Sequence, residues 1–511
     1  MAEEIFPNTV AGGATSPRSA TPANPLGLTL LATGAVFSVG LLIAVTGLVA
    51  GVYGSQISIL LLAAVTASVG LMPVALNGAL QRGHVLFSTI ALVCATYYVL
   101  PALARYIPAG GAAIPGSMAT QVVTPADIFH GQTVALIGLL SLFVGYLSPV
   151  GSALASTIPR ARIEWSRQAG IVVALGMLAM GWAITVLGSV GMLPPDLGTG
   201  FIGTLGTARL WAICLLTILY IKRRSRWIVL MLALLIPATM VFGFLTGSKR
   251  EALVGAALPV LTYMIMYRRI SLRWITAGVL ALIALYPISE FYRSAIIGEG
   301  RTSAVEALMR PDETLGRVAR FAVDAELSDL LLSGLESTAA RVDGLGVTSV
   351  FVRDTPRVVP FQRGWTLALF FIAPIPRAIW PSKPDMTIGQ WITDTYSSGL
   401  DTRTAATQIG EYYINFGVIG VIGGMILLGF VLRTTHETLI VRGGTIPAIL
   451  AATIVLYYLV TKFESAVAKQ YSNILFALVP LVAMHLLIRI LGFHDRLPGA
   501  AASVDRPGEV N

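Results

Sequence analysis

Long apolar runs separated by short polar stretches recur along most of the 511-residue chain. A run of about 20 apolar residues is long enough for a helix that crosses a bilayer. These runs are rich in Leu, Ala, Val and Gly and lack the alternation of a transmembrane barrel. The pattern predicts an all-α polytopic membrane protein with about twelve transmembrane helices. The expected spans are residues 27–50, 57–76, 85–104, 131–152, 169–192, 205–221, 227–246, 252–267, 274–289, 413–432, 445–461 and 473–492.

Polar segments divide these spans into groups. Residues 1–26, rich in Ala, Thr, Pro and Gly, predict a disordered cytoplasmic tail and lack the pattern of a cleaved signal peptide. The expected organisation is that tail, transmembrane helices 1–9 over 27–289, a long loop over 290–412, helices 10–12 over 413–492, and a second cytoplasmic tail over 493–511.

The charge distribution predicts which side of the membrane each loop occupies. Charged residues make up only 12% of the chain, against about 25% in soluble domains. Lys and Arg concentrate in alternate short loops, which places both termini in the cytoplasm and the 290–412 loop in the periplasm. That loop holds 12 Lys and Arg against 15 Asp and Glu. The net charge of +9 therefore follows membrane sidedness, and we expect no nucleic-acid partner.

The periplasmic loop has two parts with different patterns. Residues 303–345 carry apolar side chains at mixed spacings of three and four, which predicts amphipathic helices over the membrane helices. From 353 to 384, six prolines prevent a long regular helix. The apolar wedge between Trp365 and Ile375 is too short to cross a bilayer. We interpret it as a re-entrant or interfacial segment.

Basic residues in the outer loops are the first candidates for binding a phosphorylated substrate. Lys249 and Arg250 lie in a tight turn at a helix start, where backbone N–H groups also favour anions. Arg377 and Lys383 stand beside prolines, which fix the backbone, and Arg can bind phosphate through two parallel N–H bonds. The alternatives are ordinary surface pairing with Glu251 and anchoring at the membrane interface.

Three further arginines and two candidate bases complete the set. Arg209 lies about one turn inside the outer end of its helix, where it either binds substrate or snorkels to the interface. Arg293 and Arg403 are additional substrate-binding candidates. Glu411 opens the tenth predicted span, as a general base for a sugar hydroxyl or as a carboxylate favoured by the helix dipole. His130 is the rival base.

Three stretches of the chain together resemble the bacterial O-antigen and oligosaccharide repeat-unit polymerases of the Wzy type. They are TGSKRE, RGWTLALFFIAPIPRAIWPSKP and TQIGEYYINFGVIG, within roughly residues 225–435. The resemblance implies a GT-C-like membrane glycosyltransferase at the periplasmic face of the bacterial inner membrane. It implies transfer of a growing glycan from undecaprenyl pyrophosphate to the next lipid-linked repeat unit, without a metal or other cofactor. Arg250, Arg377 and Lys383 would hold the donor or acceptor pyrophosphate, with Arg250 as a catalytic residue. The adjacent Lys249 leaves open which of the two acts.

Other functions stay open at this point. An O-antigen ligase performs the same chemistry on a different acceptor. A glycosyltransferase using polyprenyl-phosphate sugars needs an acidic first outer loop, and residues 51–56 hold no acid. A lipid-linked oligosaccharide transporter is the alternative from another class, although the spans lack a series of acidic residues. Expected partners are the undecaprenyl-pyrophosphate-linked oligosaccharide, the lipid bilayer and a chain-length regulator.

Overall fold

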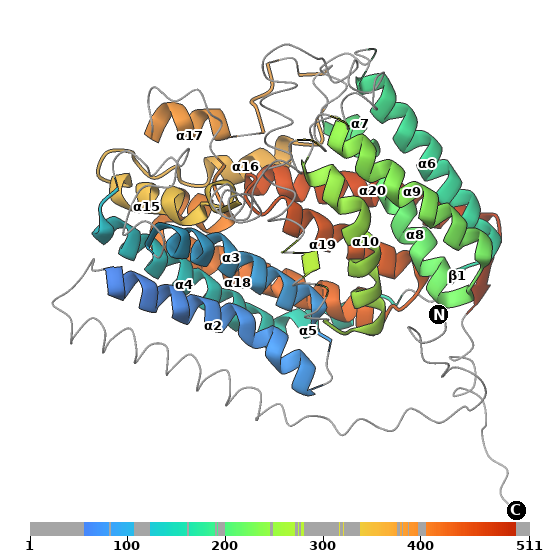
Figure 1. Ribbon diagram of the computed structural model, residues 1–511, viewed down its shortest axis with the longest axis horizontal. Coiled ribbons are helices and arrows are strands. Elements are labelled where there is room, and N and C mark those ends of the chain that lie inside the picture. Colours follow the sequence, from blue (N-terminus) through green and yellow to red (C-terminus); the bar gives the residue numbers. More distant parts are fainter. Residues whose placement is uncertain are drawn as a thin grey trace, which may run out of the picture. The chain divides into compact units, whose positions relative to one another are not determined.

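The computed structural model describes most of the helical part of the chain, and all described residues lie within one compact unit, Val52–Asn511. Helices dominate them, and the only strands among them are two of three residues each (Figure 1). The described residues are 56–80, 83–106, 123–160, 163–189, 192, 200–245, 249–270, 274, 277–278, 280, 316, 320, 338–375, 379–380, 382–386, 388–396 and 405–496.

The helices follow one another with short connections over most of this length. In chain order the elements are α2 (Gln56–Leu80), α3 (Val85–Tyr106), α4 (Pro125–Leu147), α5 (Pro149–Thr157), β1 (Ile163–Trp165), α6 (Arg167–Ser189), α7 (Gly200–Leu205), α8 (Ala208–Arg223), α9 (Arg226–Leu245), α10 (Lys249–Tyr267), α15 (Gly344–Asp354), α16 (Trp365–Ile372), α17 (Gly389–Tyr396), α18 (Gln408–Thr435), η3 (His436–Val441), α19 (Ile446–Thr461), α20 (Val467–Ile490) and β2 (His494–Arg496). Strands β1 and β2 pair antiparallel.

The all-helical prediction is confirmed for this part of the chain. Eight of the described helices are long and apolar enough to cross a membrane. Two more, Glu251–Tyr267 and Ile446–Thr461, are apolar but shorter, as expected for the shortest predicted spans. The predicted spans 27–50 and 274–289 lie outside the described residues, as does most of the predicted amphipathic region 303–345.

The predicted span 131–152 is shifted along the chain, because helix α4 covers Pro125–Leu147 instead. The start is fixed by a capping box, in which the Thr124 side chain accepts from the Asp127 N–H and the Asp127 carboxylate accepts from the Thr124 N–H. The end is fixed by Ser148, which caps α5. Hydropathy alone missed both signals because the capping residues are polar.

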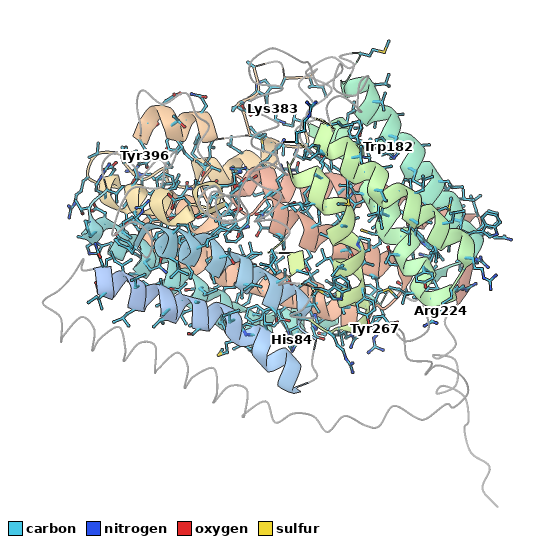
Figure 2. The ribbon with its side chains drawn as sticks, viewed as in Figure 1. His84, Trp182, Arg224, Tyr267, Lys383 and Tyr396 are labelled. Carbon is cyan, nitrogen blue, oxygen red and sulfur yellow. The ribbon has the colours of Figure 1, made fainter. Side chains whose placement is uncertain are left out.

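The bundle has two ends of different character. At one, which we call the basic end, Lys222 pairs with Glu164 at 2.6 Å, and the other Glu164 oxygen accepts from the Ile446 N–H at 2.9 Å. At the other, which we call the loop end, lie α16 and α17. Figure 2 shows Arg224 at the basic end and Lys383 at the loop end. Basic side chains gathered at the basic end include Arg160, Arg167, Arg223, Arg226, Arg268, Arg269, Arg433, Arg442 and Arg489.

Helix α18 is broken and doubles back on itself. Phe416 and Gly417 leave the helical conformation, and Gly417 has φ 64° and ψ −152°. Ile409 and Val421, on opposite sides of the break, both contact Gly138 of α4. The half-helix 408–415 therefore lies beside the longer half that follows it.

The half-helix 408–415 begins inside the bundle rather than at its surface. Thr407, its N-cap, lies 2.6 Å from the hydroxyl of Tyr98, which is buried in the middle of α3. The same hydroxyl lies 3.2 Å from Thr348 of α15. At its other end, the carbonyls of Ile414 and Asn415 accept the N–H groups of residues 362 and 363. The segment leading into α16 is thus joined to the break.

We expect Gly417→Ala to lower the free energy of unfolding by about 1–3 kcal/mol. The backbone conformation at Gly417 is open almost only to glycine, and a Cβ there would also lie 3.2 Å from the Phe361 ring. Thermal unfolding of the purified protein in detergent is the measurement.

Two glycines serve as controls for that substitution. Gly423→Ala lies on the regular part of α18 with nothing within 4 Å of the added methyl group, so stability should hold or rise. Gly444→Ala has a positive φ of 68° without a close neighbour and isolates backbone strain from crowding. Equal midpoints for Gly417→Ala and Gly423→Ala would show that the break tolerates a side chain.

Candidate functional site

The predicted site residues fall into three groups: those described with their side chains, those described as backbone only, and those outside the described residues. Arg209, Lys383 and Glu411 are described with their side chains. Lys249 and Arg250 are described as backbone in the first turn of α10, in place of the predicted turn between spans. The remaining candidates lie outside the described residues; they are Arg293, Arg377 and Arg403.

Glu411 lies in the first turn of α18 and is completely buried. Its Oε2 accepts the backbone N–H of Val467, the first residue of α20, at 2.6 Å. One carboxylate thus joins the starts of two helices. A negative charge at a helix start is favoured by the helix dipole, so this contact fits the structural interpretation of Glu411. The catalytic interpretation requires the carboxylate to become accessible to substrate.

A polar group that sequence reasoning did not assemble lies beside Glu411. The Asn415 amide donates to the Thr366 hydroxyl at 2.7 Å and to the Glu411 carbonyl at 2.8 Å. Its carbonyl oxygen accepts the Gly364 N–H at 2.9 Å. Thr366 and Asn415 are fully buried, and the Thr366 hydroxyl lies close to the Glu411 carboxyl. An amide within an apolar run was the only signal in the sequence.

Polar side chains continue from Glu411 along α18 and α20. Gln408 donates to Gln470, and the Gln470 amide donates to the carbonyls of Tyr458 and Leu459 at the end of α19. Both glutamines are completely buried. The ends of α18, α19 and α20 are therefore connected by hydrogen bonds within an otherwise apolar bundle. Buried polar groups in membrane helices are costly and frequently mark function.

Arg209 is buried and surrounded by protein partners. Its guanidinium donates to Glu251 of α10 at 2.5 Å, and to the Thr185 hydroxyl and the Gly206 carbonyl at 2.7 Å. The rings of Trp182 and Phe242 lie 5.4 and 5.8 Å from its central carbon. Arg209 is therefore not snorkelling to an interface. It holds Glu251, the residue that follows Arg250.

Lys383 lies at the loop end (Figure 2), and its side chain is largely buried. The ammonium donates to the carbonyls of Ala373 and Ile375 at 2.8 and 2.9 Å. These carbonyls follow the last turn of α16, where a cation is favoured by the helix dipole. Lys383 therefore links its own segment to the backbone that directly follows α16.

Exposed cations and the rival base also lie at the loop end. Arg357, near Tyr413, and Arg363, beside the break in α18, have exposed side chains. His130 is exposed on the second turn of α4. The sequence reasoning did not select Arg357 or Arg363, because both lie in an irregular stretch with few local constraints. Together they give the loop end positive charges that are open to solvent.

Comparisons with known proteins add one relationship. The search of curated proteins and the search of solved structures found no match. A family model described as a domain of unknown function, DUF8712, matches residues 84–446. This region runs from the start of α3 to the start of α19 and includes Arg209, Lys383 and Glu411. Because the match covers well over half of the 511 residues, the chain belongs to the DUF8712 family.

Proposed function

We propose that the protein is a membrane glycosyltransferase that polymerises lipid-linked oligosaccharide repeat units at its loop end. In this proposal the chain crosses the inner membrane about twelve times. The basic end and both termini face the cytoplasm, because Lys and Arg are retained on that side. The loop end, with the 290–412 segment, then faces the periplasm.

The observation that carries the proposal is the position of Glu411. It is an ionisable group in an apolar bundle, next to a break in the helix that bears it and beneath the segment that leads into α16. Intramembrane ionisable residues are rare because burying a charge is costly, and they mark function more often than packing. The exposed side chains of Arg357 and Arg363 lie at the same end.

The chemistry requires little covalent help from the protein. The bond between the anomeric carbon of the donor glycan and pyrophosphate breaks, and a bond from that carbon to an acceptor hydroxyl oxygen forms. Glu411 accepts the proton of that hydroxyl and later releases it to water. Arg250 and Arg377 neutralise the charge that develops on the departing pyrophosphate. Arg209 and Lys383 act through the backbone turns that they hold.

The direct test is reconstitution of the purified protein with lipid-linked repeat units extracted from a deletion strain. The wild-type protein should produce a ladder of polymer lengths. Arg250→Ala and Arg377→Ala should abolish the ladder while the protein stays in the membrane. Arg341→Ala is the matched control, because the Arg341 side chain is 57% exposed and pairs with a protein carboxylate, Glu464. Wild-type ladders in both site variants would remove these arginines from the mechanism.

One observation favours a second candidate, a lipid-linked oligosaccharide transporter. Secondary transporters bind substrates where half-helices begin inside the bilayer, and both α15 and the half-helix 408–415 approach Tyr98 inside the bundle. The deletion strain separates the candidates. If the protein is a polymerase, its deletion leaves single repeat units on their carrier in the periplasm. If it is a ligase, complete polymer stays on its carrier, and if it is a transporter, repeat units stay on the cytoplasmic leaflet.

A further inference from the structure

We propose that the loop end carries a saccharide-binding surface, which we call the aromatic platform, formed by Trp365, Trp391 and Tyr396 with the polar pair Gln390 and Asp394. This inference rests on the proposed function, because it assigns the sugar part of the same substrate. The ligand class is a neutral or weakly charged pyranose unit of the glycan.

The rings of the aromatic platform form a continuous row. The rings of Trp365 and Trp391 lie 6.1 Å apart, and the rings of Trp391 and Tyr396 are also 6.1 Å apart. Trp365 at the start of α16 is 46% exposed, so nearly half of its surface is open to solvent. Aromatic faces stack on the apolar C–H faces of sugar rings, and aromatic rings lose little conformational entropy on binding.

The far end of the row is held rigidly. The Tyr396 ring packs on Phe351 of α15 with centroids 4.8 Å apart, and its hydroxyl lies 2.8 Å from the Thr355 hydroxyl. Burial raises the pKa of Tyr396 to about 12, so the hydroxyl stays neutral at physiological pH. Trp391 therefore stands between a fixed ring and an exposed ring. The ring planes are tilted by 58° and 86° to one another, so they form a preorganised angled surface rather than one flat plane.

A polar pair lies beside Trp391 on α17. The Gln390 amide donates to the Asp394 carboxylate at 2.8 Å, and both side chains are exposed one helical turn apart. The remaining carboxylate oxygen and amide hydrogen can bind two neighbouring hydroxyl groups of a sugar. A few polar groups beside aromatic side chains are typical of small-molecule sites.

This chemistry distinguishes the aromatic platform from an ordinary interfacial anchor. Interfacial tryptophans lie at the headgroup level, commonly with Lys or Arg as neighbours. The only charge on α17 is the Asp394 carboxylate, which repels anionic headgroups. The exposed Arg363 lies two residues before Trp365, so this distinction applies to Trp391 rather than to Trp365. Large exposed apolar side chains occur elsewhere at the loop end, at Phe371 (78% exposed) and Ile379 (75% exposed). Those residues fit contact with lipid better than Trp391 does.

The aromatic platform also lies next to the candidate carboxylate. Trp365 precedes Thr366, whose hydroxyl lies close to the Glu411 carboxyl and accepts from Asn415. A sugar stacked on Trp365 is therefore bound to the segment that covers Glu411. Binding there would position the glycan for transfer beside the candidate base.

The test combines glycan binding with transfer kinetics on full-length protein in nanodiscs. The binding probe is a printed array of bacterial oligosaccharide repeat units, and the kinetic probe is the extracted lipid-linked repeat unit. Trp365→Ala, Trp391→Ala and Asp394→Asn should each weaken array binding about tenfold or more and raise KM, with kcat changed less than threefold. Trp391→Phe should retain most of the binding. Trp227→Ala, on α9 and 76% exposed, is the matched control.

The outcomes separate this inference from the proposed function. If the platform variants lose array binding but the wild-type protein makes no ladder, the aromatic platform stands as a saccharide-binding surface and the polymerase function is rejected. A normal ladder with wild-type KM in Trp391→Ala and Asp394→Asn would reject the platform and keep the polymerase. Asp394→Asn changes only an exposed group, so its result stands even where a tryptophan variant folds poorly. Unchanged array binding with weakened insertion of Trp391→Ala into nanodiscs would identify an interfacial anchor and overturn the inference.

Discussion

Replacing Glu411 by glutamine should lower polymer formation by about 10²–10⁴-fold while the protein remains folded in the membrane. Glutamine keeps the size of the side chain, and its amide oxygen can still accept the Val467 N–H that Oε2 accepts now. The substitution removes the ability to accept a proton but preserves the link between α18 and α20. The measurement is the rate of ladder formation per molecule of reconstituted protein.

Two further variants separate catalysis from structure at this position. Glu411→Ala also removes the acceptor at the start of α20 and should lower the thermal unfolding midpoint, which Glu411→Gln should largely preserve. Glu464→Gln is the charge-matched control, because Glu464 pairs with an Arg341 side chain that is 57% exposed, and it should form normal ladders. Normal ladder formation by Glu411→Gln would mean that Glu411 only joins helices, and His130 would become the remaining candidate base.

Replacing Arg209 by methionine should lower the free energy of unfolding by about 3 kcal/mol. The guanidinium side chain is only 3% exposed and pairs with Glu251, so its removal leaves a carboxylate with fewer partners in a largely apolar setting. The expected loss lies at the low end for buried pairs because the Glu251 side chain remains 21% exposed. SDS-induced unfolding of the purified protein provides the measurement.

A double variant tests whether the pair or the charge matters. Arg209→Met combined with Glu251→Leu should recover much of the loss, because apolar replacement of both partners removes the stranded charge. Arg341→Met is the control, since the Arg341 side chain is 57% exposed in its pair with Glu464, against 3% for Arg209, and should lower stability less than Arg209→Met does. Unchanged stability of Arg209→Met together with lost polymer would instead indicate that Arg209 binds substrate directly.

The segment that leads into α16 packs against the half-helix that carries Glu411. The stretch around Glu411 carries a carboxylate, an amide and aromatic residues in the sequence, and this composition pointed to a site. The structure adds that two groups of this segment bind Asn415. They are the backbone N–H of Gly364 and the side-chain hydroxyl of Thr366. Access of a substrate to Glu411 therefore depends on the segment that leads into α16. In the proposed function, cations at the loop end bind the phosphorylated part of the substrate and the aromatic rings bind its sugar part.

The sequence by itself predicted the all-helical class and nearly all of the described helices that are apolar enough to cross a membrane, because about 20 consecutive apolar residues have few other stable states in a bilayer. It also located Glu411, since a carboxylate at the start of an apolar run is conspicuous. Helix ends set by polar caps, as at Thr124, were displaced by several residues. The apolar runs, the carboxylate and the capping residues are all local features, which can be read from residues close together in the chain.

Only the tertiary structure decided which polar groups meet. Arg209 and Glu251 are separated by 42 residues, and Glu411 and Val467 by 56, so no local pattern predicts either contact. The reversal of α18 at Gly417 was equally hidden, because an apolar run with glycines fits a straight span as well as a broken one. Its direction depends on packing against Gly138 and on backbone hydrogen bonds from residues 362 and 363, which exist only once the chain has folded.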